Sequence, residues 1–258
     1  MIPTPQRAIE TALARRTVYR CLSQALFFPG DVLGATLPQG HWVGALDEAV
    51  ERLQPSDALL DALAALEIVQ PTTELAPLQR EYIRLFSSTG PSDLPPYGAD
   101  YLGSHIFMQA QSMADVAGFY QAFGVAMDAG TERPDHISAE LEFMGYLCQK
   151  EAYAAEHGLA EALTITISAE KRFLVDHLGR WAPLFLRRFE AVTRQPYYRA
   201  VAAFAQTFLA AEAARLGVSP EEVRELSGDT PLQGAFTCGA NDGTCPLTLS
   251  SSSRVGEA

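Results

Sequence analysis

The 258-residue sequence is poor in cysteine, in long apolar runs and in positive charge. Its four cysteines, Cys21, Cys148, Cys238 and Cys245, are too few and too scattered for a disulfide framework in a chain of this length. No stretch approaches the roughly 20 consecutive apolar residues of a membrane-spanning helix. Lys and Arg number 19 against 31 Asp and Glu, and the resulting net charge of −12 would repel nucleic-acid phosphates. We therefore expect neither stable membrane insertion nor nucleic-acid binding, and reduced, buried thiols at the first two cysteines.

An arginine pair near the start, Arg15-Arg16, is similar to the twin-arginine element of an export signal. The residues that follow include Arg20 and Gln24, where such a signal needs an uncharged apolar core, and no small-residue cleavage site comes after them. Apolar residues instead repeat here at helical spacing, at Val18, Leu22 and Leu26. The sequence therefore predicts an amphipathic first helix and a protein that stays in the cytoplasm.

Helical spacing of apolar residues is the dominant pattern in the rest of the chain. Such stripes occupy residues 18–26, 43–53, 59–66, 75–86, 116–123, 137–148, 174–189 and 197–211. The pattern predicts an all-α fold, a single compact domain of about nine or ten helices over residues 1–226. Residues 227–258 are rich in Gly, Ser and Thr without periodicity, which is typical of a flexible tail.

Breaker residues and local propensities qualify this pattern at four places. Clusters of Gly, Pro, Ser and Asp predict loops at residues 87–98 and 124–133. Pro183 should kink or split its helix near Trp181, because proline removes a backbone hydrogen bond and clashes one turn back. Residues 163–167 have the composition of a strand, but a lone strand has nothing to pair with, and we expect a helix there.

The most informative stretch is residues 132–147, which combine a helix-start signal, an apolar stripe and four carboxylates with a histidine. Pro134 is suited to the first position of a helix, and acidic residues beside it complement the helix dipole. Ile137, Leu141, Met144 and Cys148 then share one buried face. His136 and Glu140 lie on the neighbouring face, at the rim of this core stripe, where they could line a groove.

Several functions are compatible with these residue types. Glu132, Asp135, His136 and Glu140 suit a metal or acid–base site, so one alternative is a metal-dependent enzyme that uses His136 and Glu140. The zincin pattern, however, needs a second histidine where Glu140 stands. Asp135 and Glu132 could bind arginine or cap the helix, and for Asp135 the two roles have equal support. Cys238 and Cys245 could form half of a metal or redox site, although their wide spacing and the lack of a second ligand pair favour incidental thiols in a tail.

Three stretches of this sequence resemble motifs of one family, the TorD/DmsD-like redox-enzyme maturation chaperones. Residues 132–144 resemble its E-x-P-D-H-I-x-x-E-L-x-F-M signature. Residues 81–86 resemble its E-Y-x-R-L-F helix end, and residues 177–185 its H-L-x-x-W-x-P-x-F element. The motifs occur in the expected order, and the resemblance covers residues 10–216. Residues 95–102 lack the serine often found before the second tyrosine of the family's second loop, which points to the branch that serves dimethylsulfide, selenate, chlorate or ethylbenzene oxidoreductases.

The resemblance implies an all-helical cytoplasmic chaperone, without enzymatic activity, for a molybdenum-cofactor oxidoreductase. Such chaperones bind the twin-arginine signal peptide or the apo form of the catalytic subunit, assist cofactor insertion and prevent premature export. The resemblance implies no metal or bound cofactor of the chaperone's own, and it leaves open transient contact with molybdenum cofactor or GTP. A GTP-binding regulator of molybdoenzyme assembly is therefore another alternative, although no phosphate-binding glycine loop is present. The state expected is a monomer, or a dimer that exchanges domains through residues 124–133.

The candidate client-binding residues follow from the same motifs. Asp135 and His136 match the family's signal-peptide-binding loop, and Tyr97 falls in its second conserved loop. An acidic helical protein with a groove can also bind a basic segment followed by an apolar helix, by charge-assisted contacts and helix-in-groove packing. We expect alanine at position 135 or 136 to weaken client binding with little effect on melting. The full candidate set is Asp135, His136, Glu132, Glu140, Tyr97, Arg84 and Trp181.

Overall fold

The computed structural model describes residues 4–37, 40–87, 94–103, 106–126 and 132–226. The predicted tail at 227–258, with Cys238 and Cys245, lies outside these ranges, as does half of each of the predicted loops at 87–98 and 124–133. Within them, no helix is both long and apolar enough to cross a membrane.

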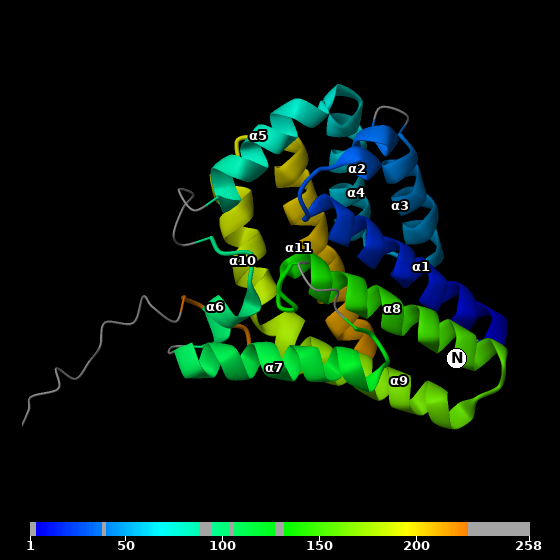
Figure 1. Cartoon of the computed structure of the whole chain (residues 1–258). Coiled ribbons are helices and arrows are strands. Elements are labelled where there is room, and N and C mark those ends of the chain that lie inside the picture. The colour runs from blue at the N-terminus through cyan, green and yellow to red at the C-terminus, as the bar shows by residue number, and fades with distance from the viewer. Residues whose placement is uncertain (1–3, 38–39, 88–93, 104–105, 127–131, 227–258) are drawn as a thin grey trace, which may run out of the picture.

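The described residues form helices joined by short connections, and the all-α prediction is confirmed (Figure 1). The elements are α1 (Pro5–Ala25), α2 (Asp31–Thr36), α3 (His41–Arg52), α4 (Asp57–Val69), a 3-10 turn η1 (Gln70–Thr72), α5 (Leu75–Phe86), α6 (Gly98–Leu102), α7 (Ile106–Ala122), α8 (Ile137–Glu156), α9 (Ala160–Phe173), a π turn η2 (Leu174–Leu178), α10 (Gly179–Val192) and α11 (Pro196–Leu216). Helices α9 and α10 are continuous through the π turn, and counted as one they bring the described part of the chain to ten α-helices. No strand is found within the described ranges.

The core lies where α1, α8, α10 and α11 meet. Helix α1 packs along the length of α8, and α11 is covered by α10 on one side and by α4 on the other (Figure 1). Gly145 allows the close approach of α1 to α8, because a Cβ there would already lie 3.3 Å from Tyr19 Cβ. Large aromatic side chains fill this core and are fully buried, among them Trp181, Tyr19, Phe173, Phe185, Phe189, Phe204 and Phe208. Cys21 and Cys148 are buried free thiols, as expected.

The irregularity predicted near Trp181 occurs one turn earlier, as the π turn at Leu174–Leu178, and Pro183 lies inside α10. The wider turn places the carbonyl oxygen of Leu174 against Gly179. A Cβ at Gly179 would collide with this oxygen and with the ring of Pro220. Residues 163–167 are helical within α9, because amphipathic packing outweighs β-propensity when no strand is available to pair with.

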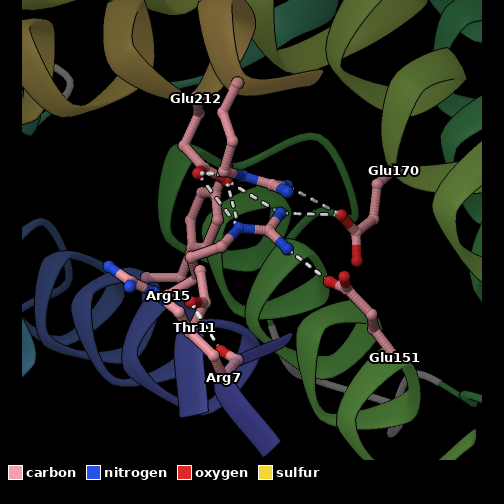
Figure 2. Close-up of polar contacts among 8 residues, drawn as sticks. Arg7, Thr11, Arg15, Glu151, Glu170 and Glu212 are labelled. Atoms are coloured by element: carbon pink, nitrogen blue, oxygen red, sulfur yellow. Dashed lines mark hydrogen bonds and ion pairs between the residues drawn. The ribbon is translucent and has the colours of Figure 1, made fainter. Parts of the chain in front are cut away.

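A buried ionic cluster joins four of the helices, and Arg15 stands at its centre (Figure 2). Its side chain is fully buried, and its Nε lies 3.0 and 2.9 Å from the two carboxylate oxygens of Glu212 in α11. Its Nη2 donates to Glu170 in α9 at 2.7 Å, and its Nη1 donates to Glu151 in α8. Arg15, the first arginine of the pair that is similar to an export signal, is therefore a structural residue of α1. The predicted amphipathic first helix is confirmed.

This cluster holds more negative than positive charge. Arg215 also binds Glu212 and Glu170. The guanidinium groups of Arg15 and Arg215 thus pair with three carboxylates, those of Glu151, Glu170 and Glu212. Burial raises the pKa of Glu170 to about 7, and no donor within the described residues reaches its Oε1 atom. Burial alone would also raise the pKa of Glu212, but the positive charges of Arg15 and Arg215 outweigh burial and lower this pKa. The surplus negative charge therefore falls on Glu170, which takes up a proton most easily.

Candidate functional site

Two loops that are far apart in the sequence meet beside the N-terminal end of α8. Tyr97 and His136 form an antiparallel β-bridge there, the isolated bridge of the described residues. Next to the bridge, Ile137 N donates to Pro96 O at 2.9 Å. The pairing fixes the start of α8 against the segment that leads into α6. We call the surface formed by residues 97–100 and 132–136 the junction.

Asp135 connects the two sides of the junction. Its carbonyl oxygen accepts from Gly98 N at 2.8 Å and its Oδ2 accepts from Ala99 N at 2.9 Å. Asp135 therefore provides acceptors for two backbone N–H groups in the first turn of α6. Arg133 binds the same carboxylate through Nε to Oδ1 (3.0 Å) and Nη2 to Oδ2 (2.7 Å). Asp135 is fully buried by these contacts. The helix that it caps is therefore α6, and not the helix that follows it in sequence.

The start of α8 differs from the prediction. The predicted first position at Pro134 is wrong, because α8 begins at Ile137 and Pro134 lies in a turn. His136 is the N-cap residue, and its Nδ1 accepts from Ser138 N at 3.2 Å. Its backbone is extended (φ −69°, ψ 140°), as pairing with Tyr97 requires. The bridge therefore holds residues 134–136 out of the helix, and the carbonyl of Pro134 accepts instead from Tyr120 Oη at 2.7 Å.

His136 is buried between aromatic rings. Its ring centroid lies 5.3 Å from that of Tyr97 and 6.1 Å from that of Phe27. Burial lowers the pKa of His136 to about 4, although Glu132 and Asp135 act in the opposite direction. The imidazole is therefore neutral near pH 7, as a hydrogen-bond-accepting cap requires.

Glu140 and Trp181 form a buried pair beneath the junction. Trp181 Nε1 lies 3.2 Å from each oxygen of the Glu140 carboxyl group, and both residues are almost completely buried. Burial raises the pKa of Glu140 well above its usual range, against the effect of the Trp181 hydrogen bond. Gly98 lies directly over the pair, because a Cβ there would be 2.7 Å from Trp181 Nε1 and 3.0 Å from Glu140 Oε1. The ring of Tyr101 stacks on that of Trp181, with centroids 5.3 Å apart.

The outer layer of the junction is polar and partly exposed. Tyr97 Oη donates to Glu132 Oε1 at 2.9 Å, and the guanidinium carbon of Arg133 lies 4.2 Å from the centre of the Tyr97 ring. Asp100 lies 3.7 Å from Arg133, whose side chain is 36% exposed. Two carboxylates, of Asp100 and Asp135, thus pair with one guanidinium group, while that of Glu132 accepts from the Tyr97 hydroxyl. Within the described residues, no group of three or more His, Cys, Asp and Glu side chains is arranged to hold a metal ion.

Residues 45–187, more than half of the chain, match the family described as the nitrate reductase delta subunit. The chain belongs to this TorD-like family. Similar members include the perchlorate reductase assembly chaperone protein of Dechloromonas aromatica (strain RCB), which is 30% identical over 78% of this chain and 89% of its own length.

Two further members of the family show the same similarity. The chlorate reductase assembly chaperone protein of Ideonella dechloratans is 30% identical over 62% of this chain and 80% of its own length. The chaperone protein TorD of Photobacterium profundum is 28% identical over 62% of this chain and 72% of its own length. These relatives are named as chaperones and not as catalysts, so this member of the TorD-like family is a maturation chaperone and not an enzyme. The family predicted from the three motifs is confirmed.

Arg84 is the candidate residue that the structure does not bring to the junction. Its guanidinium binds Glu81 through Nε (2.8 Å) and Nη2 (2.7 Å), and Nη2 also donates to Val192 O at 2.9 Å. Glu81 in turn accepts from Thr193 Oγ1 at 3.1 Å and from Arg194 N. Burial would raise the pKa of Glu81, but these contacts outweigh it and lower the pKa. The Arg84–Glu81 pair therefore joins the end of α5 to the end of α10.

An apolar surface beside the junction was missed in the sequence. Phe27 and Phe28 follow α1 and are 44% and 41% exposed, and Ile83 on α5 is 54% exposed. Phe28 packs edge-on against Tyr82, with ring centroids 5.6 Å apart, and Phe27 packs on His136. The signal that could have found it is the pair of phenylalanines after the last residue of the first stripe and before Pro29-Gly30. We call Phe27, Phe28, Tyr82 and Ile83 the aromatic edge.

Proposed function

We propose that the protein is the dedicated cytoplasmic chaperone of a molybdenum-cofactor oxidoreductase of the oxyanion-reductase class. It binds the twin-arginine leader or the apo catalytic subunit, keeps it competent for cofactor insertion and delays its export. The perchlorate and chlorate reductase chaperones among its relatives support this client class. The net charge of −12 supports a basic binding partner, because long-range attraction speeds the approach of opposite charges.

The observation that carries the peptide-binding part is the adjacency of the junction and the aromatic edge. Carboxylates of Asp100 and Glu132 are partly exposed at the junction, and the ring of His136 joins it to exposed Phe27. A twin-arginine leader has the same order of chemistry, since a basic pair precedes an apolar segment. Carboxylates bind guanidinium groups in charge-assisted pairs, and an apolar helix packs on an exposed apolar surface.

Within this proposal the candidate residues have two kinds of role. Glu132 and Tyr97 lie in the partly exposed outer layer and are proposed to contact the client directly. Asp135 is proposed to bind a client arginine once its carboxylate is uncovered. His136, Glu140 and Trp181 are buried, and are proposed to hold the two loops in place beneath the client. Arg84 is proposed to act from α5, at the side of the aromatic edge.

The experiment is a calorimetric titration of the full chain with a twin-arginine leader peptide from a candidate client, and with the same peptide carrying two lysines. We expect saturable binding of the arginine form that weakens as salt rises, because exposed charge pairs are screened. The leaderless apo-subunit, tested in the same way, separates leader binding from subunit binding. Size-exclusion chromatography of the same samples distinguishes a monomer from a domain-swapped dimer. A chain that binds neither peptide nor subunit would contradict the proposal.

A further inference from the structure

The side chain of Arg133 occupies the position at which the proposed function places a client arginine. It forms two parallel hydrogen bonds with Asp135, at 3.0 and 2.7 Å, and its guanidinium carbon lies 4.2 Å from the centre of the Tyr97 ring. Its Nη1 also lies 3.7 Å from Asp100 Oδ2. The junction therefore already contains a bound guanidinium group, and that group belongs to the chain itself.

These contacts are specific for a guanidinium group. The planar fork of arginine matches both oxygens of a carboxylate at once, and its flat face stacks on an aromatic ring. An ammonium group is a compact point charge that offers neither the parallel pair of bonds nor the stack. A site that holds Arg133 in this way is thus built to prefer arginine over lysine from any source.

Asp135 keeps its position without Arg133. Its Oδ2 accepts from Ala99 N, and its backbone carbonyl accepts from Gly98 N, so the start of α6 orients the carboxylate independently. Arg133 is 36% exposed and lies in the connection before α8, outside any helix. Its side chain can rotate into solvent without a change in the backbone of the junction. Departure of Arg133 would uncover a carboxylate that is fully buried while the pair is intact.

We propose that Arg133 is an autoinhibitory contact, an internal competitor that a client arginine must displace from Asp135 and Tyr97. This inference rests on the proposed function and adds the regulation of its site. Exchange of one guanidinium for another preserves every contact, so the client-bound junction has no unpaired buried carboxylate. The apparent affinity for the client is the intrinsic affinity multiplied by the fraction of molecules in which the site is free. If Arg133 fills the site about nine-tenths of the time, the apparent affinity is about tenfold weaker than the intrinsic one.

The same arrangement contributes selectivity. A lysine-bearing segment would have to replace two parallel bonds and a ring stack with one point charge, and Arg133 would remain in place. Only a ligand that reproduces the fork exchanges with it at little cost. Arg133 thus keeps general basic peptides away from the acidic junction of a protein whose overall charge attracts them.

The test compares Arg133→Gln with wild type in titrations with a peptide that carries two adjacent arginines, and with its two-lysine form. Arg187→Gln is the control, because Arg187 pairs with Glu222 at 3.2 Å on another part of the surface and its loss changes the net charge equally. We expect Arg133→Gln to bind the two-arginine peptide about tenfold more tightly than wild type. Arg187→Gln should match wild type, and the two-lysine peptide should remain the weaker ligand of Arg133→Gln, because an ammonium group cannot form the parallel pair of bonds.

Arg133→Lys provides a second variant if the glutamine protein melts early. It retains the charge but not the fork, and we expect a gain in affinity between those of wild type and Arg133→Gln. Unchanged or weaker binding by a folded Arg133 variant, with binding by wild type intact, would overturn the autoinhibitory contact and leave the proposed function standing. If wild type and all Arg133 variants fail to bind, both fail together. Binding that appears only when Arg133 is replaced supports the inference.

Discussion

Tyr97 and His136 pair their backbones as an antiparallel bridge, and this single pairing brings together loops that precede α6 and α8. On one side of it Asp135 caps α6, and on the other the His136 ring caps α8. The two caps explain why charged and polar residues are buried at the start of a helix in an otherwise apolar core. They also place Glu132 and Tyr97 at the surface, next to the aromatic edge.

Gly98→Ala should loosen the junction. The added Cβ would lie 2.7 Å from Trp181 Nε1 and 3.0 Å from Glu140 Oε1, so the loop or the pair must move. Overpacking of this kind costs about 1–3 kcal/mol of unfolding free energy, which urea denaturation measures. Gly118→Ala on α7 is the control, because its Cβ meets nothing within 4 Å, and it should be neutral or stabilise by up to about 1 kcal/mol. Equal effects of the two substitutions would contradict the close approach of Gly98.

Glu140→Ala should destabilise the protein much more than Glu140→Gln. The alanine variant leaves the buried Nε1–H of Trp181 without an acceptor, at a cost of about 1–3 kcal/mol beyond the lost packing. Glutamine keeps an oxygen for that bond and removes a carboxyl group whose pKa burial raises. Urea denaturation at pH 7 checks the difference, and similar midpoints for the two variants would show that the Trp181 bond contributes little.

Arg15→Met should cost about 3–5 kcal/mol of unfolding free energy. It removes the cation shared by Glu151, Glu170 and Glu212 and leaves uncompensated buried carboxylates. Arg20→Met on the exposed side of the same helix should change stability by no more than about 0.5 kcal/mol. If the two variants unfold alike, the cluster does not hold the helices together.

Glu170→Gln should alter how stability depends on pH. Burial raises the pKa of Glu170 from its usual 4.5 to about 7, so the folded state binds a proton that the unfolded state has lost. The unfolding free energy of wild type should therefore fall, relative to the variant, as pH rises from 4.5 to 7, by about 1–3 kcal/mol. His136, with its pKa lowered to about 4, acts in the opposite direction, but it is present in both proteins and cancels in the difference. A difference that is constant over this range would contradict the raised pKa.

Most helices could be predicted from the sequence because apolar spacing reports directly which face of a helix is buried. The stripe that ends at Phe86 matches α5, for example. The short helices α2 and α6 could not be predicted in this way, since they have too few turns to show a period. Helix α6 in particular depends on a hydrogen bond from Ala99 to Asp135, a residue distant in the chain.

Most of the candidate residues lie together at the junction, but the sequence did not show which are buried and which are partly exposed. The motifs contain Asp135 and Trp181, and Tyr97 falls in the second loop; the structure places all three at or beneath the junction, whereas Arg84 lies elsewhere. Local signals placed the helix start at Pro134, because a proline next to acidic residues is favoured at the first position of a helix. These signals carry no information on the pairing of His136 with Tyr97, which keeps residues 134–136 out of the helix. The partners of Arg15 were also invisible in the sequence, because no spacing rule connects a residue of the first helix to glutamates in three others.

The most direct test of the central claim is the preference of the protein for a two-arginine over a two-lysine leader peptide, measured for wild type and for Asp135→Asn. Asparagine can still accept from Ala99 N, but it cannot form the charged fork with arginine. The account predicts that wild type binds the two-arginine peptide about tenfold or more tightly, since loss of a charge-assisted pair is worth about 1.4 kcal/mol or more, and that Asp135→Asn loses this preference while it remains folded. Equal binding of the two peptides by wild type would contradict it.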